Sequence, residues 1–136
     1  MRRFVILTAV LAVTAACSAD PGGQEIDITG NWELLNGSVD GEAIPLFDGS
    51  PVTLNVTDDE IGGTSACNSY GAQMVLDGAE ISLSDLVSTL MMCTPEVMAV
   101  EVPYTAALSQ VNAVTFDGDT LVLTGPGVEL RFARAG

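Results

Sequence analysis

Alternating apolar and polar residues flank a tight turn near the C-terminal end of the chain. The turn is Gly125-Pro126-Gly127, and it lies between residues 121–123 and 128–132. Period-two alternation on both sides of a Gly/Pro turn is typical of a β-hairpin with one buried face. Residues 111–116 join this hairpin through Asp117-Gly118-Asp119, so the pattern predicts an antiparallel meander. The side chains expected to face the core are Leu121, Leu123, Val128, Leu130 and Phe132.

Shorter strand signals occupy most of the preceding sequence. Strands are predicted over residues 32–35, 52–56, 61–70, 73–76 and 80–83. The turn signals between them are Asn36-Gly37, Asp40-Gly41, Asp58-Asp59-Glu60 and Asp77-Gly78. The chain is therefore predicted to be mainly antiparallel β.

One segment departs from the strand pattern. Thr94-Pro95-Glu96 combines an N-cap residue, a proline at the first helical position and an acid in the first turn. Apolar residues then recur at helical spacing over residues 97–111, and Pro103 inside this pattern should make the helix kink or restart. One helix packed on a sheet gives an α+β fold, here a compact, mostly antiparallel β-sheet or roll.

The N-terminus has the pattern of a secretory signal. Met1-Arg2-Arg3 is followed by an apolar run and by the small residues Thr14-Ala15-Ala16. Cys17 comes next, and this arrangement resembles a bacterial lipobox, in which the thiol is lipidated and becomes the new N-terminus. We expect residues 1–16 to be a lipoprotein signal peptide, residues 17–27 a flexible tether and residues 28–134 one domain.

This interpretation places the protein outside the cytoplasm, anchored to the cell membrane by lipid on Cys17. Two alternatives stay open. Residues 4–16 could remain as an uncleaved anchor, although this run is shorter than the ~20 residues of a transmembrane helix. Cleavage without lipidation would leave Cys17 as a free thiol.

The charge of the chain excludes nucleic-acid binding. The formal net charge is −14, with no lysine and no histidine, and loss of Arg2 and Arg3 with the signal takes it to −16. Only Arg131 and Arg134 then remain as cations, whereas affinity for phosphate backbones requires clustered Lys and Arg. Without histidine, a Ser-His-Asp or Cys-His arrangement cannot form, so no catalytic residues are predicted.

Two cysteines, Cys67 and Cys93, remain once Cys17 is assigned to lipid. In an oxidising compartment two such cysteines favour a disulfide, because a zinc site would need further Cys or His ligands that the chain lacks. A disulfide between them would stabilise the fold by roughly 3–4 kcal/mol through loop-closure entropy.

Four motifs follow one another along the domain. The first is Gly30-Asn31-Trp32-Glu33-Leu34, and the second is the Gly-rich stretch over residues 62–71. The third is Thr89-Leu90-Met91-Met92-Cys93 with a glutamate in the following helix, and the fourth is the terminal hairpin. In this order they resemble the META domain, or HslJ-like, family over residues 30–132. The matching motif residues are Trp32, Gly62, Gly63, Cys67, Asn68, Tyr70, Thr89, Met91, Cys93 and Glu101.

The resemblance implies a compact antiparallel fold with one helix, placement in the cell envelope and a loose link to stress tolerance. It implies no established enzyme chemistry and no agreed ligand. The residue types by themselves favour a structural role for the second motif. Gly62 and Gly63 permit close backbone approach, and Asn68 can cap its own turn through its side chain. Cys67 would lock this strand to the segment before the helix.

We therefore expect a non-catalytic interaction or stress-tolerance module of the envelope, with no cofactor. Its expected partners are the membrane, through Cys17, and either envelope proteins or an apolar small molecule. The first alternative is a small-molecule or lipid carrier with an apolar pocket between sheet and helix. The second is a hydrolase that uses carboxylates alone.

Two acidic turns are candidate calcium sites. Asp58-Asp59-Glu60 and Asp117-Gly118-Asp119 hold the oxygen ligands that calcium prefers, but such turns are also ordinary hairpin signals, so no metal site is predicted.

The methionines are expected to fill the core, with a groove lined by Met91 or Met92 as the alternative. The methionines concerned are Met74, Met91, Met92 and Met98.

Overall fold

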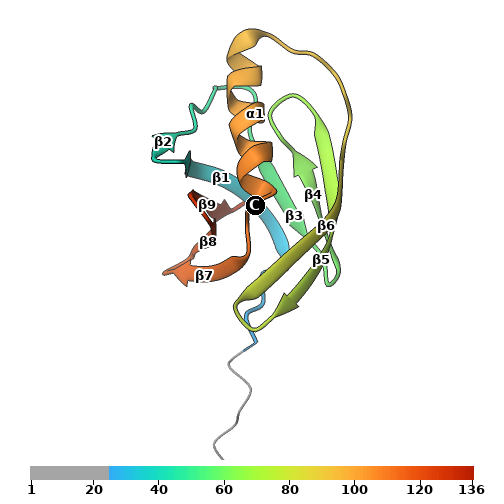
Figure 1. The fold of residues 1–136 in the computed structure, drawn as a ribbon, viewed down its shortest axis with the longest axis vertical. Helices are drawn as coiled ribbons and strands as arrows, with labels where there is room; N and C mark the ends of the chain where they lie inside the picture. The colour runs from blue at the N-terminus through green and yellow to red at the C-terminus, as the bar shows by residue number, and fades with distance from the viewer. Residues whose placement is uncertain (1–24) are drawn as a thin grey trace, which may run out of the picture.

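A computed structural model describes residues 25–136 of the protein (Figure 1). The predicted signal peptide, Cys17 and most of the predicted tether lie outside the described residues. Nine strands and one helix make up the described chain. The strands are β1 Gly30–Val39, β2 Glu42–Ala43, β3 Thr53–Val56, β4 Glu60–Thr64, β5 Ser69–Asp77, β6 Glu80–Ser88, β7 Ala113–Asp117, β8 Thr120–Gly125 and β9 Val128–Arg134. The helix is α1 Pro95–Leu108.

The strands close into a barrel. They follow the order β2-β1-β3-β4-β5-β6-β7-β8-β9, and a further pairing between β1 and β9 joins the two sides. All the pairings are antiparallel, and β2 is a short extension that pairs with the last two residues of β1. The sequence predicted a mostly antiparallel sheet or roll, and the structure is more specific, because eight strands form a closed barrel.

The longest strand corrects one turn prediction. Asn36-Gly37 does not reverse the chain but lies inside β1, where the register with β9 shifts between Leu34 and Asn36. Such a β-bulge bends a strand and increases its twist, which closure of a small barrel requires. Gly37 fits there because an added Cβ would lie 2.8 Å from the Leu130 side chain. The reversal comes at the predicted turn Asp40-Gly41, where both residues have positive φ.

The predicted strand over residues 61–70 is divided in two. β4 ends at Thr64, and the chain turns over residues 65–68 before β5 begins. Within this turn the Ser65 amide donates to the Asn68 carbonyl at 2.8 Å, and Ala66 has a φ of 81°. The Gly-rich motif therefore spans a strand, a tight turn and the start of the next strand.

The helix begins where the sequence indicated, with Thr94 at the N-cap and Pro95 in the first turn, although the Thr94 side chain makes no capping hydrogen bond. It does not restart at Pro103, because one helix continues to Leu108. The carbonyl that would have bonded to the missing N–H belongs to Ala99, an exposed residue whose carbonyl can be hydrated. No helix within residues 25–136 is long and apolar enough to cross a membrane.

The core fills the barrel and the interface between barrel and helix. From α1, Val100, Tyr104, Ala107 and Leu108 are buried, and the helix packs on β1 and β9. The inward side chains of the terminal hairpin are buried as predicted. Each such large apolar side chain contributes about 1.5–3 kcal/mol through burial. The buried side chains of the terminal hairpin that belong to this core are Leu121, Leu123, Val128, Leu130 and Phe132.

The barrel has a weak seam between β6 and β7. These strands share one register pair, Glu80 with Ala113, and two flanking hydrogen bonds from Ile81 to Asn112 and from Val114 to Ala79. Beyond that point β6 pairs with β5 alone, up to Ser88. We call residues 82–88 of β6 the free edge, because no other strand of the described chain pairs with them on that side.

Gly63 offers a direct test of strand packing in the barrel. It has a φ of 147°, and an added Cβ would overlap the carbonyl oxygen of Thr53. Gly63→Ala is expected to lower the free energy of unfolding by about 3 kcal/mol or more. Gly118→Ala is the matched control, since Gly118 also has positive φ but no atom near the added Cβ, and it should cost about 1 kcal/mol. Urea denaturation of both variants measures the difference, and equal losses would contradict the packing argument.

Candidate functional site

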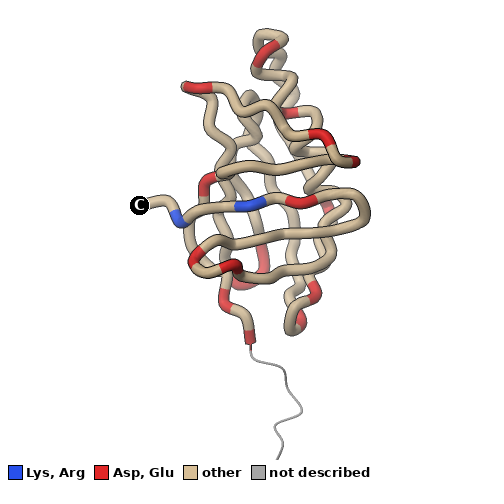
Figure 2. Tube along the Cα trace, turned by 90° about the vertical axis from the view of Figure 1, so that its left-hand side faces the viewer, with Lys and Arg blue, Asp and Glu red and all other residues tan. Residues whose placement is uncertain are grey.

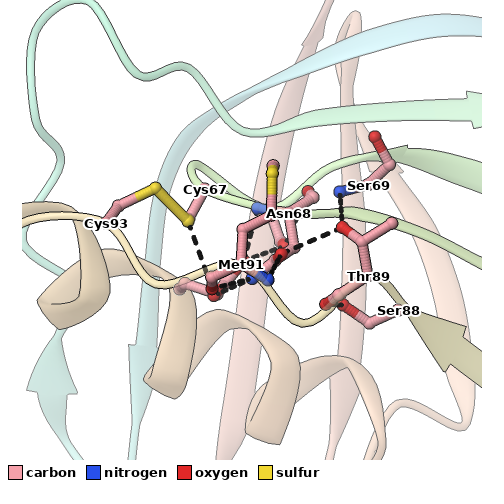
Figure 3. Close-up of a disulfide and its surroundings, with 9 residues drawn as sticks. Cys67, Asn68, Ser69, Ser88, Thr89, Met91 and Cys93 are labelled. Atoms are coloured by element: carbon pink, nitrogen blue, oxygen red, sulfur yellow. Dashed lines mark hydrogen bonds between the residues drawn. A yellow bond between two sulfur atoms is a disulfide. The ribbon is translucent and has the colours of Figure 1, made fainter.

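Most of the predicted motif residues meet at one end of β5 and β6. The turn at residues 65–68, the segment over residues 89–94 and α1 come together there (Figure 3). The Cys67–Cys93 disulfide links the turn to the residue just before the helix N-cap, with the two Cα atoms 5.9 Å apart. The structure thus contains the disulfide that the cysteine count predicted.

Asn68 joins the turn to the segment that follows β6. Its Oδ1 accepts hydrogen bonds from the Met91 amide at 2.6 Å and from Thr89 Oγ1 at 2.9 Å (Figure 3). Its Nδ2 donates to the Met91 carbonyl at 3.1 Å, so the side-chain amide pairs with Met91 as another strand would. The prediction that Asn68 caps its own turn is therefore wrong, because its side chain bonds partners more than twenty residues away.

Glu101 holds the same turn from the helix side. Its Oε1 accepts from Ser65 Oγ at 2.6 Å and from the Asn68 amide at 2.7 Å. Its Oε2 accepts from Asn68 Nδ2 at 2.7 Å. Glu101 is 5% exposed and has no basic partner in the described chain, so these three donors replace the water that its carboxylate loses. We call Ser65, Asn68, Thr89 and Glu101 the polar cluster.

Two buried tyrosines lie beside the polar cluster. Tyr70 donates its hydroxyl proton to the Thr53 carbonyl at 2.7 Å, so Tyr104 must donate to Tyr70 across the 2.7 Å between their hydroxyl oxygens. Their rings meet edge to face, with centroids 5.7 Å apart. Burial raises the pKa of both hydroxyl groups above the ordinary value of 10.0, and both tyrosines stay neutral in the folded protein.

The remaining motif residues serve the fold rather than the polar cluster. Trp32 is buried in the barrel, donates from Nε1 to the Ile28 carbonyl at 2.9 Å and has Arg134 over its ring at 4.3 Å. Gly62 and Gly63 let β4 lie close to its neighbours, because added Cβ atoms would crowd the carbonyls of Tyr70 and Thr53. This close approach is the one expected of the two glycines.

A groove adjoins the polar cluster, between the end of β6 and α1. Its volume is about 370 Å³, and Asn68, Tyr70 and Glu101 lie among the residues that line it. Half of the lining residues have apolar side chains. They are Leu86 from β6, Leu90, Met91 and Met92 from the connecting segment, and Met98 and Val102 from α1.

The methionines correct the prediction of core filling. Only Met74 is a core residue, whereas Met91 and Met92 are 58% and 84% exposed and Met98 is half-buried. All three of the latter line the groove. Sequence periodicity did not reveal this, because residues 89–94 belong to no regular element whose buried face could be inferred.

Sequence reasoning also missed two polar partners. Ser65 is not among the motif residues that the sequence identifies, yet it is fully buried and bonded to Glu101. Tyr104 lies within the helical pattern over residues 97–111, and that pattern does not predict its hydrogen bond to Tyr70. No local signal identifies either contact, since each joins residues more than thirty positions apart.

The acidic turns do not come together. Asp117 pairs with Arg131 on β9, and Asp58 and Asp59 lie in the turn between β3 and β4. Within residues 25–136 no group of three or more His, Cys, Asp or Glu side chains is arranged to hold a metal ion.

The three hydrogen bonds to Glu101 lead to a stability prediction. Glu101→Gln presents an amide NH₂ to donors that need an acceptor, and it is expected to lower the free energy of unfolding by about 2–3 kcal/mol. Glu96→Gln in the first turn of the same helix is the matched control, because Glu96 is exposed, and it should change stability by at most about 0.5 kcal/mol. Thermal or urea unfolding of the two variants measures the difference. If Glu101→Gln costs no more stability than Glu96→Gln, the carboxylate is not the acceptor that holds the turn.

The raised pKa values of Tyr70 and Tyr104 predict alkaline unfolding. A tyrosine whose folded pKa is raised stabilises the fold fully below its unfolded pKa of about 10, and this stability is lost as the pH rises further. The protein has two tyrosines in all, so tyrosinate absorbance near 295 nm reports on this pair alone. Absorbance should appear only together with loss of the folded circular dichroism signal. Ionisation near pH 10 in a folded protein would refute the assignment.

Comparison with known proteins shows which family has this arrangement. A search of curated proteins found no match. Among solved structures, an NMR structure of a protein from Burkholderia xenovorans is similar, with 26% identity, a TM-score of 0.61 and coverage of 85% of this chain and 96% of that one. A second NMR structure has 22% identity and a TM-score of 0.58, over 77% of this chain and 88% of that one.

A crystal structure of a DUF4847 family protein from Bacteroides vulgatus shares the fold at 10% identity, with a TM-score of 0.56 and coverage of 77% and 92% of the two chains. The sequence model of the META domain matches residues 24–136, which include the barrel, the helix and every residue of the polar cluster. The chain belongs to the META domain family.

Proposed function

We propose that this protein is a non-catalytic interaction module of the cell envelope and that it binds its partner through the groove between β6 and α1. The observation that carries the proposal is the exposure of large apolar side chains at the groove. Leu90 is 97% exposed and Met92 is 84% exposed, and both lie in a segment that internal bonds hold in place. Contiguous apolar exposure of this kind is typical of a binding surface.

The polar cluster supports this reading because it makes the exposure a fixed feature. Asn68 bonds the amide and carbonyl of Met91, and the disulfide fastens the segment two residues later at Cys93. A free apolar segment could fold down onto the core, whereas this one is held outward at both ends. Methionine side chains adapt to different apolar shapes, so Met91, Met92 and Met98 suit the lining of such a site.

The chemistry around the groove supports binding rather than catalysis. Glu101 is the acidic group among the residues that line it, and its carboxylate already accepts three internal hydrogen bonds. Histidine is absent from the whole sequence. A general acid or base needs a titratable group within reach of a substrate, and Glu101 is committed to holding the turn.

Envelope placement is part of the same proposal. The signal-like N-terminus, Cys17 in a lipobox-like position and the internal disulfide all fit a lipid-anchored protein of an oxidising compartment. Lipid on Cys17 would hold the domain at the membrane through the tether, because a surface of this acidity is repelled by anionic headgroups.

A carrier of an apolar small molecule is the second candidate. The groove volume of about 370 Å³ lies at the lower end of the range for small-molecule sites, and its lining is largely apolar. The groove is not an enclosed cavity, however, and the barrel interior is filled by packed side chains. Native mass spectrometry distinguishes the two candidates, because a carrier purified from its own membrane should retain an apolar adduct.

Site-specific photo-crosslinking in cells tests the interaction module. A crosslinking amino acid at Met92 is expected to capture one defined partner, and Leu90→Lys in the same chain should abolish the product by placing a charge in the apolar groove. Val75 is the control position, because it is 67% exposed on β5 and does not line the groove. Equal capture from Val75 and Met92, or a Met92 product that survives Leu90→Lys, would refute the groove as the binding surface.

A further inference from the structure

We propose that the partner binds by strand addition: an extended, cationic and apolar segment of another polypeptide pairs with the free edge of β6, between β6 and α1. This inference rests on the proposed function and specifies its partner. It depends on four observations: the unpaired backbone of the free edge, the position of the groove, the charge around it and the place of the N-terminal segment.

The backbone of the free edge has hydrogen-bonding capacity to spare. β6 pairs with β7 at Glu80 only, whereas its pairing with β5 continues to Ser88. The N–H and C=O groups of residues 82–88 that point away from β5 therefore face no other strand of the described chain. Edges of this kind are templates for an added strand, which gains affinity from main-chain hydrogen bonds.

The groove gives an added strand a place to lie. Leu86 and Ser88 of β6 line one wall, and Met98, Val102 and Thr105 of α1 line the other. Residues 84–88 are exposed on both faces of β6, although the preceding half of the strand alternates normally between buried and exposed residues. A strand paired with this edge at the usual spacing of about 4.8 Å would present alternate side chains to the apolar wall of the helix.

The charge around the groove and the free edge favours a cationic segment as the partner. Among the described residues that line the groove none is basic, and Glu101 is buried and already paired with internal donors. Asp85 lies on the free edge itself, at the position where the β5–β6 register shifts, with a φ of 54°. The arginines of the described chain, Arg131 and Arg134, are both on β9 (Figure 2).

The same charge disfavours a second copy of this chain as the occupant. Each copy carries a net charge of −14, and pairing two free edges would bring two Asp85 carboxylates together. An acidic residue and a bulge on an edge strand are devices that prevent pairing between like chains. They leave the edge open to a chain of opposite charge.

The N-terminal segment lies at the other end of β6. Residues 25–29 line a pocket with Leu76 and Gly78. The start of the described chain lies near the turn that joins β5 to β6 (Figure 1). Ser88 is eight residues along β6 from Glu80, or roughly 26 Å at about 3.3 Å per residue. An anchor at Cys17 would therefore join the domain at the end of β6 away from the groove, which leaves the groove free for a protein partner.

A synthetic peptide tests the inference on the purified protein with the disulfide intact. The probe alternates lysine and valine and has the length of the free edge. NMR-detected amide exchange should slow by about tenfold or more at alternate residues of the free edge when the peptide is bound. The same peptide N-methylated at every second backbone amide keeps all its charges and side chains but cannot pair as a strand, so it should bind about tenfold or more weakly.

Charge is tested on the protein side. Asp85→Asn, which tolerates the positive φ, should weaken binding of the lysine peptide by about threefold, whereas Glu42→Gln on β2 should leave it unchanged. A glutamate–valine peptide should not protect the free edge. Full protection by that peptide would refute charge selection.

The outcomes separate the two proposals. If the N-methylated peptide binds as well as the parent, or if residues 82–88 gain no protection at saturation, strand addition is refuted, whatever the Met92 crosslinking shows. If Met92 captures no partner in cells but the free edge pairs with the peptide, strand addition stands as a property of the domain and the proposed function fails. A dimer formed through residues 82–88 would instead make a second copy the occupant and overturn the inference.

Discussion

The buried carboxylate of Glu101 is the contact on which this end of the molecule depends. Removing a charge from water costs several kcal/mol unless hydrogen bonds replace the lost hydration, and three donors from Ser65 and Asn68 do so here. These bonds fix the helix to the turn, and Asn68 then fixes the turn to Met91. The disulfide makes a second, covalent link between the same two segments. Because both hydrogen bonds and a disulfide fasten the segment before α1 to the turn, this segment has a defined position without any regular secondary structure.

A fixed junction has a consequence for the surface above it. Leu90 and Met92 remain in water although apolar side chains gain free energy by burial, and the bonds to Met91 between them prevent that gain. Natural proteins leave large apolar side chains exposed against the burial pattern mainly at functional sites. The polar cluster and the groove are therefore parts of one arrangement, in which a buried scaffold maintains an exposed apolar surface.

The seam between β6 and β7 leaves part of the β6 backbone unpaired beside this surface. A closed barrel removes sheet edges, but this barrel closes through a single register pair at the seam and leaves the second half of β6 paired on one side. The helix lies across the groove from this strand instead of a neighbouring strand. A META domain built this way combines a sealed core with one open edge, and the open edge lies beside the apolar surface.

Local patterns in the sequence determined most of the elements, the cysteine pair and the buried faces of the terminal hairpin, because periodicity and turn chemistry act within a few residues. The tertiary structure alone decided what depends on distant partners. Closure of the barrel joins β1 to β9 across almost the whole domain, and it turns Asn36-Gly37 from an expected turn into a bulge. The long-range bonds of Asn68 and Glu101 replace the local cap that Asn68 by itself suggests. The exposure of Met91 and Met92 follows from those bonds, since a side chain's burial depends on what packs against it and not on its own polarity.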